Sequence, residues 1–157
     1  MMDPPEDGSF ALALEEEAAT LAFGRALAAR LRPGDVVALF GGLGAGKTTL
    51  ARGILAGLGH DGDVASPTFP IVQTYDPPDT RLPVWHVDLY RIEAAEELDE
   101  LGLDEAREDG VLLIEWPERL PALWPGTLQL RLEPAATGGR ALTALVPEAW
   151  GGRWPPR

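Results

Sequence analysis

The chain of 157 residues has no cysteine and few basic residues. Without cysteine it can form neither a disulfide nor a catalytic thiolate. The 13 Lys and Arg residues are outnumbered by 25 Asp and Glu residues, which gives a formal net charge of -12. A surface of that sign repels phosphate groups, so we expect no strong direct binding to nucleic acid and no attraction to an anionic membrane.

Long apolar segments are lacking as well. No stretch approaches the about 18 consecutive apolar residues that a membrane-spanning helix needs. Residues 1–7, MMDPPED, are acidic, whereas a secretory signal begins with basic residues followed by an apolar stretch. We therefore expect a cytoplasmic protein with no membrane association.

Asparagine is absent, and lysine occurs once, at Lys47, beside 12 arginines. The guanine-recognition signature Asn/Thr-Lys-x-Asp needs a lysine outside the phosphate-binding loop, which this chain cannot supply. A GTP-dependent switch protein is thereby disfavoured. Because a compact ammonium and a planar guanidinium are not interchangeable at a phosphate, the single lysine indicates a functional position.

The motif that organises the sequence is GGLGAGKT at residues 41–48, which matches G-x-x-x-x-G-K-S/T at every fixed position. Residues 36–40 predict a strand before it and residues 49–55 a helix after it, the context that a phosphate-binding loop (P-loop) requires. Glycines let backbone N–H groups and the helix N-terminus approach a triphosphate, and a tight turn without a ligand is the weaker alternative. We expect nucleotide binding by Gly42, Leu43, Gly44, Ala45, Gly46, Lys47, Thr48 and Thr49.

Side-chain chemistry adds to this interpretation. Lys47 supplies a charge near the β- and γ-phosphates, and the Thr48 hydroxyl can bind Mg²⁺. Residues 111–114 are apolar, as in a buried parallel strand, and Glu115 follows them. Such a carboxylate lies at the carboxyl edge of the sheet, beside the P-loop, where Mg²⁺ needs an acidic ligand or an attacking water needs orienting.

The segment around Thr68 is open to two interpretations. Pro67 favours an extended backbone at Ser66, so the hydroxyls of Ser66 and Thr68 could reach Mg²⁺ or a γ-phosphate. The same pattern is equally consistent with a turn that has no ligand.

The remaining segments complete an α/β fold. We expect a strand at 9–14, a helix at 15–32, a hairpin of strands 71–75 and 82–87, short helices at 94–101 and 103–108, and a hairpin of strands 127–133 and 140–146. Together they predict one three-layer domain over residues 1–157 with a mixed, mainly parallel central sheet. The P-loop strand is expected at its centre, and residues 1–8 and 148–157 are expected to be flexible.

Residues 93–109 carry nine carboxylates and one arginine. A charge run of this kind usually forms a solvated face. The alternative is a docking surface for a basic partner.

Several motifs together resemble one family, TsaE, the P-loop ATPase that serves bacterial synthesis of threonylcarbamoyladenosine in tRNA. They occur in the family's order over about residues 12–120, and this ordered combination is more specific than any motif alone. The matching residues are GLGAGKTT at 42–49, SPTF at 66–69, HVDLYR at 86–91, EEL at 96–98 with Gly102, and LIEWPE at 113–118.

The resemblance implies catalytic and metal-binding roles. Lys47 would bind phosphate, and Thr48 and Glu115 would hold Mg²⁺. Asp88 would be a second acid at the metal, either ordering a metal-bound water or helping to activate the attacking one. Thr68 would lie in a switch-like segment that senses the γ-phosphate.

The resemblance also implies nucleotide contacts outside the P-loop. Trp116 would pack near the nucleotide, and Glu17 would approach the adenine. Gly42 departs from the family, which commonly has Asp there. Because that position is not a phosphate ligand in the generic motif, we expect the departure to have little effect.

The cofactors implied are ATP or ADP with Mg²⁺, and the partners implied are TsaD, the transferase that modifies adenosine next to the anticodon, and TsaB. ATP binding and hydrolysis would support or reset that machinery. Two alternatives remain at this point. One is a small-molecule kinase, which normally needs an acceptor pocket and a basic lid; the other is a nucleotide-sensing adaptor with negligible turnover.

Overall fold

The computed structural model describes residues 9–42, 44–64, 72–136 and 138–156. Within these residues, no helix is long and apolar enough to cross a lipid bilayer. In chain order the elements are β1 (Ser9–Leu14), α1 (Glu17–Ala28), β2 (Val36–Phe40), α2 (Lys47–Gly57), β3 (Val72–Tyr75), β4 (Val84–Asp88), α3 (Ala95–Leu101), α4 (Leu103–Asp109), β5 (Val111–Glu115), the 3₁₀ turn η1 (Pro117–Arg119), β6 (Leu128–Pro134), β7 (Arg140–Leu145) and the 3₁₀ turn η2 (Glu148–Trp150).

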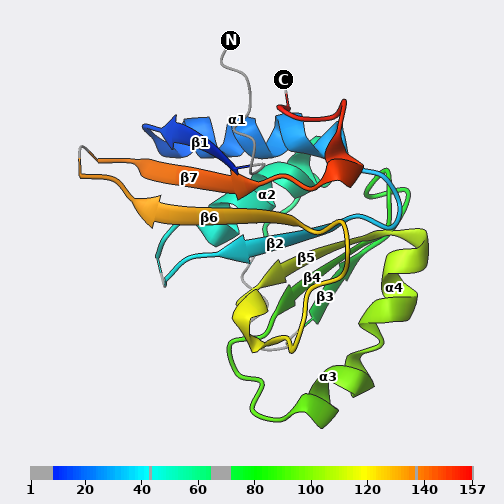
Figure 1. Cartoon of the computed structure of the whole chain (residues 1–157). Coiled ribbons are helices and arrows are strands. Elements are labelled where there is room, and N and C mark those ends of the chain that lie inside the picture. Colours follow the sequence, from blue (N-terminus) through cyan, green and yellow to red (C-terminus); the bar gives the residue numbers. More distant parts are fainter. Residues whose placement is uncertain (1–8, 43, 65–71, 137, 157) are drawn as a thin grey trace.

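The seven strands of the described residues form one sheet with the order β1-β7-β6-β2-β5-β4-β3 (Figure 1). The pairs β6–β2, β2–β5 and β5–β4 are parallel, and the outer pairs β1–β7, β7–β6 and β4–β3 are antiparallel. The predicted mixed α/β fold with a central P-loop strand is confirmed. Because β2, β5 and β4 are parallel neighbours, their carboxyl ends lie at one edge of the sheet.

Helices α1 and α2 pack together on one face of the sheet (Figure 1). Two glycines allow their close approach: a Cβ on Gly24 would lie 2.8 Å from the Leu50 carbonyl oxygen, and one on Gly53 would lie 2.6 Å from that of Leu21. The fully buried Ile54 belongs to the same core cluster as the sheet residues facing these helices. This packing fixes the start of α2 against β2.

The opposite face is covered over the parallel strands. There Val36, Leu112 and Ile114 form a second core with Leu103 of α4. In Figure 1, α3 and α4 lie at the β3–β5 end of the sheet, whereas Leu145 of β7 is 44% exposed. In the described part of the chain, the fold thus has three layers at the β5–β4 end of the sheet and two at the β7–β1 end.

Helix α1 is shorter than the predicted helix over residues 15–32. Its last turn tightens, since the Arg30 N–H donates to the Leu27 carbonyl and the Leu31 N–H to that of Ala28, three residues back in each case. Pro33 follows, and because the residue before a proline avoids the helical region, the chain turns toward β2.

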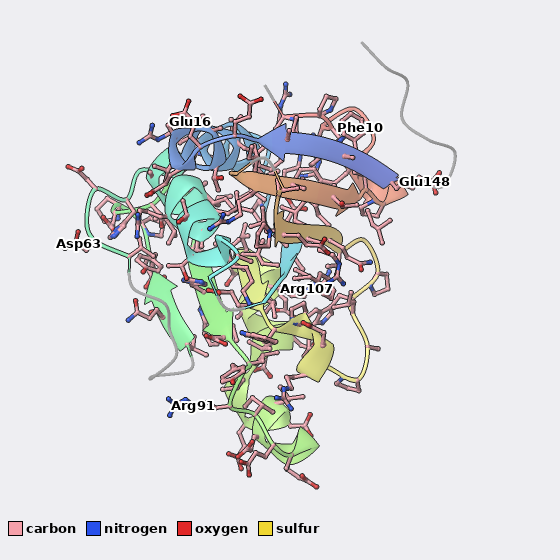
Figure 2. All side chains as sticks on the ribbon, turned by 90° about the vertical axis from the view of Figure 1, so that its left-hand side faces the viewer. Phe10, Glu16, Asp63, Arg91, Arg107 and Glu148 are labelled. Atoms are coloured by element: carbon pink, nitrogen blue, oxygen red, sulfur yellow. The ribbon has the colours of Figure 1, made fainter. Side chains whose placement is uncertain are left out.

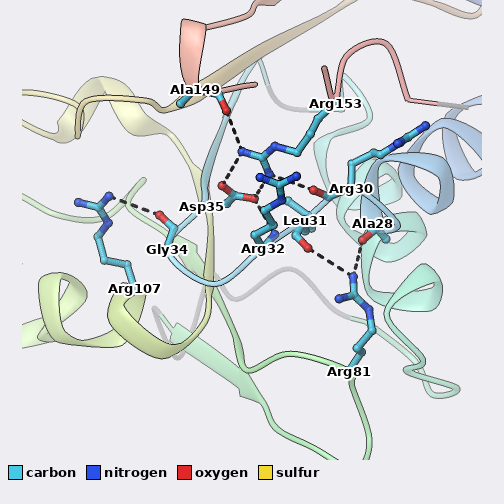
Figure 3. A network of polar contacts seen from close by, with 10 residues as sticks. All are labelled: Ala28, Arg30, Leu31, Arg32, Gly34, Asp35, Arg81, Arg107, Ala149 and Arg153. Atoms are coloured by element: carbon cyan, nitrogen blue, oxygen red, sulfur yellow. Dashed lines mark hydrogen bonds and ion pairs between the residues drawn. The ribbon is translucent and has the colours of Figure 1, made fainter. Parts of the chain in front are cut away.

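Residues 148–156, for which flexibility was expected, make several contacts with distant parts of the chain. Trp150 is fully buried, and the Arg153 guanidinium donates to the Asp35 carboxylate at 2.7 and 3.2 Å and to the Arg30 carbonyl at 2.9 Å (Figure 3). The Trp154 ring packs edge-on against that of Phe10, 5.7 Å between centroids. These long-range contacts are not visible in a local sequence pattern.

Candidate nucleotide-binding site

The P-loop joins β2 to α2 through glycines in conformations that other residues rarely adopt. Gly41, Gly44 and Gly46 have φ angles of +145°, +76° and +105°, and Gly46 is the N-cap of α2. A Cβ on Gly41 would lie 2.6 Å from the Leu132 carbonyl oxygen, so the loop also passes close to β6. The first turn of α2 has no acidic residue and no side-chain cap, which suits a helix N-terminus that binds an anion.

A cleft of about 420 Å³ lies against this loop. Four elements far apart in the sequence contribute to it, namely α2 with its preceding loop, the end of β4, the end of β5 and the start of β7. Its lining consists of Gly44, Ala45, Gly46, Lys47, Thr48, Thr49, Asp88, Tyr90, Glu115, Trp116 and Arg140. Most of the predicted site residues therefore meet in one place.

The two carboxylates of the cleft are neighbours in the sheet. Asp88 of β4 pairs in register with Glu115 of β5, and the two residues are only 5% and 3% exposed. One oxygen of Asp88 accepts a hydrogen bond from the Tyr90 N–H at 2.9 Å. Two buried acids side by side repel each other unless a cation lies near them, so their placement favours a cation site.

The described lining of the cleft contains two cationic residues, Arg140 and Lys47, and Lys47 interacts electrostatically with both carboxylates. Its ammonium donates a hydrogen bond to the Gly41 carbonyl at 2.7 Å and lies 3.9 Å from the centroid of the Trp116 ring. Burial lowers the pKa of Lys47 from its ordinary value, and the carboxylates of Glu115 and Asp88 partly oppose that shift. The ammonium is thus poorly hydrated, which strengthens its attraction to an incoming phosphate.

Trp116 adopts a backbone conformation unusual for its type. Its φ of 58° makes it the one non-glycine residue with positive φ in the described ranges. Its ring also packs against that of Tyr90, 4.9 Å between centroids. Conformations of this kind cost about 1–3 kcal/mol and concentrate at functional sites. Here the unusual backbone conformation of Trp116 brings its indole ring against the Lys47 ammonium.

Glu115 has a buried partner that the sequence analysis did not identify. His86 Nε2 lies 2.6 Å from Glu115 Oε2, and the His86 side chain is fully buried. His86 precedes Asp88 by two residues on β4, so the two side chains lie on the same face of the strand. The alternation of side chains along a strand could therefore have indicated, from the sequence alone, that His86 lies on the same face as Asp88.

Arg140 is the second residue that sequence analysis missed. From the start of β7 its guanidinium donates to the carbonyls of Ala45 at 2.8 Å and Gly44 at 3.0 Å. It therefore holds the back of the P-loop, and it lines the cleft as well. No local motif marks it, because its position depends on how β7 pairs with β6 and β1.

Glu17 and Thr49 line a smaller hollow of about 250 Å³, which shares Gly46, Thr49 and Arg140 with the cleft. Glu17 also makes an exposed ion pair with Arg52 of α2 at 3.5 Å. The position beside the start of α2 is compatible with the predicted approach to adenine, which stays a prediction. Leu43 and Thr68 lie outside the described residues.

Two further residues of the motifs that resemble the TsaE family, Gly42 and Arg91, lie in the described part of the chain. A Cβ on Gly42 would meet no atom of the described residues within 4 Å, which leaves room for a side chain to begin there. Arg91, at the end of the HVDLYR motif, is exposed and points away from the body of the protein (Figure 2).

The donor set fits magnesium bound together with a nucleotide. Thr48, Asp88 and Glu115 offer a hydroxyl and carboxylate oxygens, the hard ligands that Mg²⁺ prefers. Within the described ranges, no group of three or more His, Asp and Glu residues could hold a metal ion alone. Phosphate oxygens and water would have to complete the shell, as is usual for Mg²⁺ at phosphate-transfer sites.

The comparisons with known proteins agree on one family. The family described as "Threonylcarbamoyl adenosine biosynthesis protein TsaE" matches residues 14–142. A Streptomyces coelicolor protein named tRNA threonylcarbamoyladenosine biosynthesis protein TsaE is 45% identical over 114 residues, 71% of this chain and 77% of that protein. The Bacillus subtilis protein of the same name is 42% identical over 126 residues, 79% of this chain and 77% of that protein. The crystal structure of Bacillus subtilis YdiB is similar at a TM-score of 0.74 and 33% identity, covering 88% of this chain and 86% of that one. The chain therefore belongs to the TsaE family.

Proposed function

We propose that this chain binds and hydrolyses ATP with Mg²⁺ and thereby supports formation of N6-threonylcarbamoyladenosine in tRNA. The observation that carries the proposal is the meeting of the P-loop with two paired carboxylates, Asp88 and Glu115, in one cleft. The names of the TsaE relatives support the pathway. The residues that line the cleft support ATP binding and hydrolysis with Mg²⁺.

The phosphates would lie over the N-terminus of α2. Backbone N–H groups of the loop and of the first helical turn would donate to their oxygens. Lys47 would exchange its hydrogen bond to the Gly41 carbonyl for one to the β- and γ-phosphates. Thr48 and Glu115 would hold Mg²⁺, which when bound neutralises charge on the β- and γ-phosphate oxygens.

Asp88 would act on water. Its hydrogen bond from the Tyr90 N–H fixes one oxygen, and the carboxylate lines the cleft beside Glu115. It would order a metal-bound water or accept a hydrogen bond from the attacking water. Arg140 would keep the loop in its binding conformation through the Ala45 and Gly44 carbonyls.

We propose TsaB and TsaD as the partners. The chain has a net charge of -12, so contact with tRNA through a partner is more favourable than direct binding. The segment 93–109, which contains α3 and α4, carries nine carboxylates and one arginine and is our candidate for docking to a basic partner surface. Nucleotide-dependent changes near the cleft would then alter how the chain binds its partners.

Labelled ATP tests the proposal. We expect the wild-type chain with TsaB and TsaD to release free phosphate in a Mg²⁺-dependent reaction. Lys47→Ala should weaken ATP binding or hydrolysis at least tenfold, and Glu115→Ala should still bind ATP in EDTA but lose Mg²⁺-dependent release.

Each other outcome contradicts part of the proposal. Label on an organic acceptor would indicate a kinase, and ATP-dependent partner binding without phosphate release would indicate an adaptor. Normal hydrolysis by Glu115→Ala would move the metal role elsewhere, with Asp88 the first candidate.

A further inference from the structure

We infer that His86 is a positioning residue that fixes one oxygen of Glu115 so that the other faces the metal site. The inference rests on the proposed function, because it concerns the carboxylate assigned to Mg²⁺. Its basis is a short contact: His86 Nε2 and Glu115 Oε2 are 2.6 Å apart, with side chains 0% and 3% exposed.

The strands set this contact. Asp88 and Glu115 are in register on β4 and β5, and His86 lies two residues before Asp88. Side chains at i and i+2 of a strand lie on one face, so the imidazole reaches Glu115 from behind the cleft. His86 is absent from the cleft lining, whereas Asp88 and Glu115 both line it. The histidine therefore touches the carboxylate without facing the nucleotide.

The other ring nitrogen indicates which tautomer is present. His86 Nδ1 is buried and has no hydrogen-bond partner in the described part of the structure. A proton on Nδ1 would be a buried donor without an acceptor, which is more costly than a bare nitrogen lone pair. A ring proton therefore belongs on Nε2, where it is donated to Glu115, whose carboxylate must be ionised to bind a metal.

This hydrogen bond restrains rotation of the carboxylate. With Oε2 engaged by His86, Oε1 is the oxygen available to the cleft. Partners that orient metal ligands in this way typically contribute 10- to 100-fold to metal affinity or activity. The alternative is that His86 only fills the core behind the sheet, in which case any side chain of similar size would serve equally well.

Two variants separate these roles. His86→Phe keeps an aromatic ring of similar size without a donor, and His86→Gln keeps an N–H donor at the ε position. The control is Thr80→Val, which removes a buried hydroxyl that donates to the Leu82 carbonyl at 2.7 Å and does not line the cleft. It reports the general effect of losing one buried hydrogen bond.

The measurement is binding of ATP by calorimetry to the full chain, first in EDTA and then at graded Mg²⁺ concentrations. We expect all variants to bind ATP in EDTA as the wild type does. His86→Phe should need about 10- to 100-fold more Mg²⁺ for half of the metal-dependent gain in affinity, while His86→Gln and Thr80→Val should stay within about threefold of wild type. A wild-type Mg²⁺ midpoint in folded His86→Phe would overturn the inference.

A second measurement needs no variant. In ¹⁵N spectra of the wild-type chain, His86 should show a protonated Nε2 and an unprotonated Nδ1. The opposite tautomer would overturn the inference even if His86→Phe did not fold. If the wild-type chain gained no ATP affinity from Mg²⁺ at all, the proposed function would fail instead, so the two failures are distinguishable.

Discussion

The Lys47 ammonium lies 3.9 Å from the centre of the Trp116 ring, and Trp116 adopts the left-handed backbone conformation that brings its ring there. The contact joins the residue that would bind phosphate to an indole ring, whose fluorescence depends on its surroundings. An ammonium over an indole face contributes about 0.5–2 kcal/mol when partly desolvated. Departure of the ammonium from the ring would therefore change the surroundings of the indole.

We expect ATP binding to change the intrinsic tryptophan fluorescence through Trp116. In Trp116→Phe the change should disappear while ATP still binds, as calorimetry would show. Trp124→Phe is the control, since Trp124 lies outside the cleft and donates to Asp104 on α4. An unchanged signal in Trp116→Phe would contradict the assigned contact between nucleotide, Lys47 and indole.

The P-loop glycines should differ in their tolerance of a side chain. Gly46→Ala places a Cβ at a φ of +105°, 3.4 Å from the Arg140 Nε, and should weaken ATP binding about tenfold or more, because left-handed conformations of non-glycine residues cost about 1–2 kcal/mol. A Cβ on Gly42 would meet no atom of the described residues within 4 Å, so Gly42→Ala and Gly42→Asp should bind within about threefold of wild type. Equal losses at both positions would contradict this description of the loop.

The C-terminal segment should contribute to stability. Arg153 and Asp35 form an ion pair at 2.7 Å whose side chains are 8% and 11% exposed. Arg153→Met leaves Asp35 without this partner and should lower the free energy of unfolding by about 3 kcal/mol, measured by urea denaturation. Arg91→Met, at an exposed position that points away from the body of the protein, is the matched control and should change it by less than about 0.5 kcal/mol.

One ion pair should make stability depend on pH. His60 Nδ1 lies 2.7 Å from Asp79, and this hydrogen bond raises the pKa of His60 above its ordinary value. A raised pKa means that the contribution is complete below the unfolded value of about 6.5 and is lost as pH rises through the folded value. His60→Gln should therefore lower the melting temperature more at pH 5.5 than at pH 9. A larger loss at pH 9 would contradict the assignment.

Local sequence signals predicted the centre of the fold well. The apolar run at β2, the glycine loop and the start of α2 form a continuous strand–loop–helix pattern that depends on few distant contacts. The position of Glu115 followed from one rule, namely that parallel strands end at the same edge of the sheet. In the structure, Asp88 and Glu115 are paired in register at the carboxyl ends of the parallel strands β4 and β5, as the rule predicts.

Contacts between segments far apart in the sequence could not be predicted from local patterns. Arg140 reaches the P-loop only because β7 pairs with β6 and β1, and no pattern near it specifies that register. Flexibility was expected for residues 148–157, yet the ion pair of Arg153 with Asp35 joins residues 118 positions apart in the sequence. His86 was within the resemblance, but its partner depends on the pairing of β4 with β5.

A crystal structure with a non-hydrolysable ATP analogue and Mn²⁺, located by its anomalous signal, tests the central claim most directly. The account predicts phosphates over the N-terminus of α2, with the metal bonded to the Thr48 hydroxyl and to Glu115, and with Lys47 moved from the Gly41 carbonyl to a phosphate. A metal and triphosphate bound elsewhere, or a P-loop that stays empty at saturating ligand, would contradict it.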